Sequence, residues 1–148
     1  MALLTSIRDG LKTRLETISG LTASEFVPDY IVPPIALVAP LNTLNYDSTM
    51  GRGADTYEIP IVVYISRIDA QTSQDEVDAF LASSGATSIK AAIEGDPTLG
   101  GAAMSVRVIS ATDYGEYEVT QGTSYLGVTF NIEVIAWKLK YWLEVIFQ

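Results

Sequence analysis

Few residues of this chain are of the types that carry out catalysis. Its 148 residues include no cysteine and no histidine, which excludes disulfides, thiolate nucleophiles, sulfur-based metal sites and the commonest general base. Aspartate, glutamate, lysine, tyrosine and serine remain, so the chemistry left open is carboxylate-dependent hydrolysis or a magnesium site.

One acidic group has the residue types of a metal site: Asp75, Glu76 and Asp78. The alternating oxygen ligands, central glycine and final glutamate of an EF-hand loop are missing around it. Ser73 followed three residues later by Glu76 is instead a capping-box pattern, and the helix dipole favours acidic side chains in a first turn. We therefore interpret this group as the start of a helix near Gln74.

Two further groups are weak candidates for a site. Gly51-Arg52-Gly53 lacks the additional glycine and the lysine of phosphate-binding loops, so it is typical of a loop tip. Glu116 and Glu118 are two residues apart in a loop or strand, a spacing that would place them on the same face, as acid/base work could use, but no partner group accompanies them. Nearby tyrosines are interpreted as core or interface anchors: Tyr114, Tyr117 and Tyr125. We predict no enzyme activity, cofactor or metal.

The charge is strongly acidic, with nine basic and eighteen acidic residues and a formal net charge of −9. This balance opposes non-specific adhesion to nucleic acid, because phosphate binding depends on lysine and arginine. The acidity is explained either by solubility or by a repulsive surface along which DNA slides. No apolar run approaches the roughly 20 residues that span a bilayer, and no signal-peptide core is present, so we expect a soluble, cytoplasmic protein.

The hydrophobic pattern predicts one α+β domain with a mixed, mainly antiparallel β-sheet. An N-terminal helix and a central helical pair should pack on that sheet, because their apolar residues recur at three- and four-residue steps. The length and the 48% apolar content suit a single core. The expected elements are a helix from Leu3 to near Gly20, strands at 35–39, 57–65, 104–108 and 126–136, and helices between residues 74 and 95.

The connections carry further expectations. Residues 41–55 are polar and turn-prone, which predicts a long protruding β-hairpin before the strand that begins at Tyr57. Pro60 cannot donate a ladder hydrogen bond, so this strand should start at an edge or carry a bulge. Residues 114–123 are expected to be a polar link. Residues 143–148 look like the site left by a 3C-type protease, which assigns the domain to residues 1–142; a native C-terminal element is the alternative.

Several segments occur in the order found in the tail terminator proteins of long-tailed bacteriophages and related prophages. The chain resembles this family over most of residues 1–137, and the order of the segments carries the resemblance. The segments are Ile18-Ser19-Gly20-Leu21, Val27-Pro28-Asp29, Pro33-Pro34-Ile35-Ala36, the hairpin around Met50-Gly51-Arg52-Gly53, Ser88-Ile89-Lys90-Ala91-Ala92-Ile93 and Asp96-Pro97-Thr98-Leu99-Gly100-Gly101.

The resemblance implies an α+β subunit that forms a hexameric ring on the head-proximal end of the tail tube and stops tube growth. Its partners would be copies of itself, the tail tube protein and a head-completion or neck protein, and DNA would pass through the lumen without specific binding. The protein would be assembled in the host cytoplasm and reside in the virion.

A closed ring requires a heterologous interface, and we predict that the 41–55 hairpin provides it. The predicted interface residues are Tyr46, Asp47, Met50, Arg52 and Tyr57. An ordinary mobile loop is the alternative. Two rival functions remain: a stopper or other neck protein of the head–tail joint, and a carboxylate-dependent hydrolase or small ligand-binding module. The sign of the last would be a pocket with two convergent carboxylates of perturbed pKa.

Overall fold

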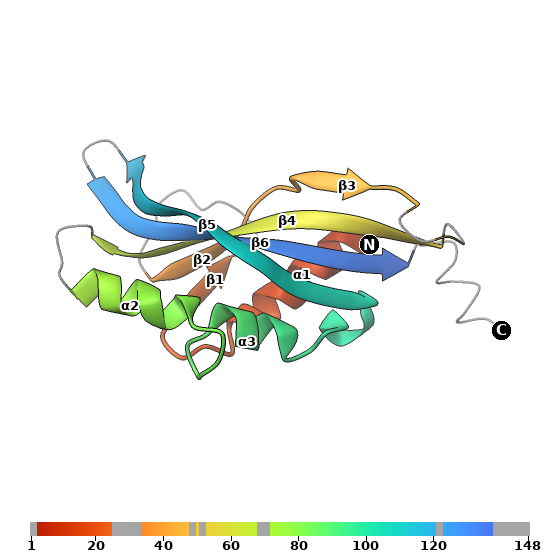
Figure 1. Cartoon of the computed structure of the whole chain (residues 1–148), viewed down its shortest axis with the longest axis horizontal. Helices are drawn as coiled ribbons and strands as arrows, with labels where there is room; N and C mark the ends of the chain where they lie inside the picture. Colours follow the sequence, from red (N-terminus) through yellow and green to blue (C-terminus); the bar gives the residue numbers. More distant parts are fainter. Residues whose placement is uncertain are drawn as a thin grey trace.

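The computed structural model describes residues 3–24, 34–47, 50, 53–67, 72–120 and 123–137. In this part of the chain three α-helices pack on a sheet of six strands (Figure 1). The elements are α1 (Leu3–Leu15), β1 (Thr22–Ser24), β2 (Ile35–Val38), β3 (Thr43–Asn45), β4 (Ala54–Arg67), α2 (Thr72–Leu81), α3 (Ile89–Glu94), the 3-10 helix η1 (Leu99–Gly101), β5 (Ser105–Thr120) and β6 (Thr123–Trp137). The predicted α+β class is confirmed.

The sheet is mixed and mostly antiparallel, with the strand order β1-β2-β4-β6-β5. Only β1 and β2 pair in parallel among the described strands. Strands β4 and β6 form its centre and pair from Ala54 opposite Trp137 to Arg67 opposite Tyr125, with one register shift between Tyr64 and Ser66. β3 pairs with Thr56 to Glu58 of β4, on the same side of β4 on which β2 pairs further along the strand. The predicted hairpin therefore exists as β3 and the first part of β4.

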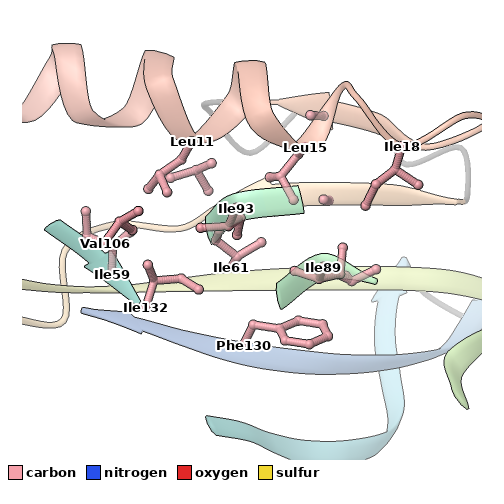
Figure 2. Close-up of a cluster of buried hydrophobic side chains, with 14 of the residues drawn as sticks. Leu11, Leu15, Ile18, Ile59, Ile61, Ile89, Ile93, Val106, Phe130 and Ile132 are labelled. Carbon is pink, nitrogen blue, oxygen red and sulfur yellow. The ribbon is translucent and has the colours of Figure 1, made fainter. Parts of the chain in front are cut away.

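The helices bury their apolar stripes on one face of this sheet. Leu11 and Leu15 lie one helical turn apart on α1, and both are fully buried. Figure 2 shows them above Ile61 of β4, with Ile93 of α3 between the layers. Helix α3 begins at the N-cap Ser88, whose hydroxyl accepts a hydrogen bond from the Ala91 N–H. Burial of this apolar layer is the main driving force for the fold.

The strict alternation of β4 and β6 decides what the other face of the sheet carries. In β4 the odd-numbered side chains from Tyr57 to Ile65 are buried toward the helices, whereas Glu58 and Pro60 point to the opposite face. In β6 the even-numbered side chains are buried, which leaves Asn131 and Glu133 on that opposite face. We call this the outer face of the sheet.

The polar link expected at residues 114–123 is wrong, because β5 continues to Thr120 and β6 starts at Thr123. Residues 110–114 of β5 are all exposed, so this stretch has no apolar alternation to reveal it. Backbone pairing with β6 holds it, and two register shifts, at Ile109 and at Asp113 and Tyr114, break its pattern further. The sequence signal for a strand is therefore absent even though the strand is present.

Of the two alternatives expected for the strand with Pro60, β4 carries an irregularity, the register shift between Tyr64 and Ser66, and it does not start at an edge, because β6 and β3 pair on its two sides. Pro60 lies opposite Asn131 in β6, and its carbonyl accepts a hydrogen bond from the Ala39 N–H at 3.0 Å. A strand residue directs its carbonyl and its N–H to the same side, so the missing donor of Pro60 faces the connection between β2 and β3. The pairing with β6 loses no bond, and proline is tolerated in a strand that is paired on both sides.

Gly127 is needed where β6 crosses beneath two tyrosines on the outer face. A Cβ atom at Gly127 would lie 2.7 Å from the Val63 carbonyl oxygen and 3.2 Å from the Tyr117 ring. We expect Gly127→Ala to lower the free energy of unfolding by about 1–3 kcal/mol, as overpacking does. Urea denaturation would measure this change in the free energy of unfolding.

The matched control is Gly115→Ala, because Gly115 is the register partner of Gly127 in β5 and a Cβ there meets nothing within 4 Å. Its unfolding free energy should change by less than about 0.5 kcal/mol. Equal effects of the two substitutions would contradict the close approach at Gly127.

Candidate assembly surface

The turn between β3 and β4 presents two large apolar side chains to solvent. Tyr46 is 69% exposed and Met50 is fully exposed. The backbone beneath them is tethered, because the Asp47 N–H donates a hydrogen bond of 2.9 Å to Oδ1 of Asp55, which is only 7% exposed. Asp47 has the left-handed φ of 56° that aspartate tolerates in turns. The turn therefore displays Tyr46 from a fixed support.

The other predicted interface residues have different places. Tyr57 is 8% exposed and belongs to the core, so its side chain supports the hairpin from below. Burial raises the pKa of Tyr57, and the nearby Asp55 carboxylate and Tyr46 raise it further. Arg52 lies outside the described residues. The interface at this hairpin stays a prediction, with Tyr46, Asp47 and Met50 as its exposed members.

A groove with a volume of about 290 Å³ crosses the outer face near this turn. Its apolar walls are Pro60 of β4 and Ile109 of β5, and Asn42 lines its opposite end. Glu58 and Glu133 face each other in it, since they are register partners of β4 and β6. The backbone carbonyl of Glu58 accepts a hydrogen bond from the Asn42 N–H, but neither glutamate side chain forms an ion pair or hydrogen bond with another described residue. We call this feature the outer groove.

Sequence analysis did not find the outer groove. Glu58 and Glu133 each occupy a polar position in an alternating strand, and that alone marks a solvated face. Their meeting depends on the register between two strands that are far apart in the sequence. Ile109 reaches the groove because the register shift between Val108 and Ser110 inserts it as an extra residue, leaving it 50% exposed.

The free edge of β5 is blocked close to the groove. The Val108 N–H, which points away from β6, donates a hydrogen bond of 3.0 Å to Oε2 of Glu94 in α3. Glu94 also pairs with Lys90 one turn earlier. Further along β5, Asp113 has a left-handed φ of 56°, and its carbonyl accepts a hydrogen bond from the Tyr117 hydroxyl. Side-chain caps and bulges of this kind prevent strands of other molecules from adding to a sheet.

The remaining candidate residues of the sequence are dispersed. Asp75 and Asp78 are exposed on α2, which begins at Thr72, close to the expected start. The side chains of Glu76, Glu116 and Glu118 lie outside the described part of the structure. In that part no group of three or more acidic side chains is placed to hold a metal ion. None of the described helices is both long and apolar enough to cross a membrane.

No protein-family model matches the sequence, and no curated protein matches it significantly. Support for a function therefore comes from the fold, from the exposed turn and the outer groove, and from the resemblance in the order of sequence segments.

The tether of the turn leads to a stability prediction. Asp55→Ala removes the acceptor of the Asp47 N–H, and we expect the free energy of unfolding to fall by about 1–2 kcal/mol, because a hydrogen bond to a charged group is lost at a site that water partly reaches. Asp55→Asn keeps an acceptor oxygen and should recover at least half of this loss. Hydrogen exchange of the Asp47 amide provides the local readout, and unchanged protection in Asp55→Ala would refute the tether.

A second prediction concerns pH and Glu94. Burial raises the pKa of Glu94, but the hydrogen bonds from Lys90 and from the Val108 N–H, together with the charges of Lys90 and Arg107, lower it below its ordinary value of 4.5. A carboxyl whose pKa is depressed on folding stabilises the protein above its unfolded pKa, and this contribution is lost as the pH falls through the folded pKa.

We therefore expect Glu94→Gln to reduce the unfolding free energy by about 1 kcal/mol at pH 7, with partial exposure limiting the effect. The difference from the parent protein should shrink as the pH falls below 4.5 and be lost once Glu94 is protonated in the folded protein. Glu16→Gln is the matched control, because Glu16 pairs with Lys12 in the same i,i+4 geometry at 4.0 Å but is 54% exposed, and its effect should stay below about 0.5 kcal/mol. A Glu94→Gln difference that does not decrease as the pH falls would show that the lost contact is not ionic.

Proposed function

We propose that this chain is a structural subunit of a bacteriophage tail, a tail terminator that caps the head-proximal end of the tail tube and stops its polymerisation. The observation that carries the proposal is the exposed Tyr46 next to Asp47, whose N–H is hydrogen-bonded to the buried Asp55, together with the exposed Met50 in the same connection. Exposed aromatic and methionine side chains on a small domain mark protein–protein contacts. A fixed backbone reduces the entropy lost when such a contact forms.

Ring assembly is consistent with the shape of the sheet. Its two edges are different, with β3 and the short β1 on one side and the blocked strand β5 on the other. A subunit with two unlike sides suits head-to-tail contacts, which close into a ring when the rotation between copies allows it. The resemblance to tail terminators implies six copies, with the tail tube protein on one side of the ring and a head-completion or neck protein on the other.

The net charge of −9 supports the same role. Genomic DNA must pass through a terminator ring without being held, and carboxylates repel phosphate. The ring would reside in the virion at the head-proximal end of the tail, after assembly in the host cytoplasm.

A carboxylate-dependent hydrolase is the second candidate, because the outer groove brings Glu58 and Glu133 together. Among the described residues, those that line the groove include no aromatic side chain for a sugar ring and no basic residue for a phosphate. Its volume of about 290 Å³ is also at the lower end of the roughly 300–1,000 Å³ of small-molecule pockets. Assembly is therefore the better supported function.

The proposal predicts the behaviour of tails. Purified protein without residues 143–148 should form a closed oligomer of six copies in light scattering and should bind one end of isolated tail tubes in electron microscopy. Tails assembled without it should be overlong, because nothing stops tube growth. Tubes of normal length that fail to join heads would identify a stopper or neck protein instead. A protein that stays monomeric at all concentrations and does not bind tail tubes would exclude both roles.

A further inference from the structure

The exposed turn and the outer groove have complementary chemistry. The groove offers apolar walls, Pro60 and Ile109, beside the hydrogen-bond acceptors Glu58 and Glu133. An occupant that fits it must combine a flat apolar body with a hydrogen-bond donor. A tyrosine side chain has both, which is why tyrosine is enriched at interfaces. Tyr46 is the most exposed aromatic side chain of the described residues.

The two glutamates favour an incoming donor. Like charges directly opposite each other on neighbouring strands are destabilising, and Glu58 and Glu133 are such a pair. Arg107 lies opposite Glu133 in β5, but it is exposed and forms no ion pair with it. A hydroxyl placed between the two carboxylates would donate to one of them and would shield them from each other.

The positions of the two features favour contact between copies. Tyr46 directly follows β3, which pairs with β4 on the side of the sheet away from β5 (Figure 1). The lining of the groove extends from Asn42, just before β3, to Ile109 of β5. Because Tyr46 lies past the end of β3 and the groove lies across the outer face, the two surfaces are unlike, as a head-to-tail contact between copies requires. The blocked edge of β5 disfavours the addition of a strand from another copy and leaves the insertion of a side chain as the mode of contact.

We propose that Tyr46 of one copy, with Met50 beside it, inserts into the outer groove of the next copy, so that the occupant of the groove is a second copy of this chain. The inference rests on the proposed assembly role and specifies its contact. The Tyr46 ring packs between Pro60 and Ile109, its hydroxyl donates to Glu58 or Glu133, and Met50 covers the rim.

Cross-linking tests the contact directly, because the chain contains no cysteine of its own. Asn45→Cys lies beside Tyr46, and Ser110→Cys lies beside Ile109; both positions are exposed. Mixing the two single variants with a short bis-maleimide should link residue 45 of one copy to residue 110 of another, as identified by peptide mass mapping. Ser84→Cys, at an exposed position after α2, is the control and should give only background linkage.

Two cross-linking results would overturn the contact: linkage no greater than the Ser84→Cys background, and products joined only through 45–45 or 110–110 pairs. A parent protein that remains monomeric would overturn it as well. Linkage at residue 110 to a tail tube or neck protein, with no 45–110 product in assembled tails, would assign the groove to that partner and also refute the proposal.

Substitutions of Tyr46 test how much this side chain contributes to the affinity between copies. Tyr46→Ala should weaken self-association roughly 30-fold, the loss typical of a central anchor residue. Tyr46→Phe, which keeps the ring and loses the donor, should weaken it only a few-fold. Tyr114→Ala is the control, since Tyr114 is 46% exposed but lies outside the groove, and it should change self-association less than about twofold. Sedimentation equilibrium measures all three, and circular dichroism verifies that each variant is folded.

The outcomes separate this contact from the proposed function. A parent protein that forms rings and caps tubes while Tyr46→Ala assembles normally would leave the terminator role intact and refute the contact. A 45–110 product together with tails of normal length in the absence of the protein would support the contact and refute the terminator role.

Discussion

The apolar layer between helices α1 and α3 and strands β4 and β6 is the constraint on which the rest of this molecule depends (Figure 2). To fill this layer, both long strands must direct alternate side chains toward the helices. Their mutual register is then set, because a slip by one residue would move the whole apolar set to solvent. The outer face is the by-product of this requirement, and Glu58 meets Glu133 because Ile59 and Ile132 are needed on the other side.

Strand β5 shows how the same sheet limits association. Its exposed edge would accept strands from other molecules, but the Val108 N–H already donates a hydrogen bond to the Glu94 carboxylate, and the bulge at Asp113 bends the edge. These devices suppress open-ended pairing of sheets. The proposed contact through a particular side chain and a particular groove is more restricted in geometry, and the proposed ring of defined size would need that restriction.

The chain contains no histidine or cysteine and has twice as many acidic as basic residues. Tyr46 is exposed beside Asp47, whose N–H is hydrogen-bonded to Asp55, and Met50 in the same connection is exposed too, whereas Tyr57 is buried. The hairpin therefore combines a buried base with exposed apolar side chains. The same hairpin is one of the segments that resemble tail terminators, and its exposure and hydrogen bonding add a structural argument for the proposed assembly role.

The sequence by itself determined the elements whose apolar residues repeat with a clear period. These are the N-terminal helix with Leu11 and Leu15, strands β4 and β6, and the central helices. Each has a buried side, so its apolar residues repeat with the period of the element. The hairpin that carries Tyr46 was predicted from turn-prone residues instead. The link predicted at residues 114–123 was wrong because the second half of β5 depends on backbone pairing with β6, and the place of Pro60 depends on the gap between β2 and β3.

Tertiary structure alone decided the outer groove, the tether from Asp47 to Asp55 and the cap from Glu94 to Val108. Each joins residues through strand register or helix packing, which no local pattern records.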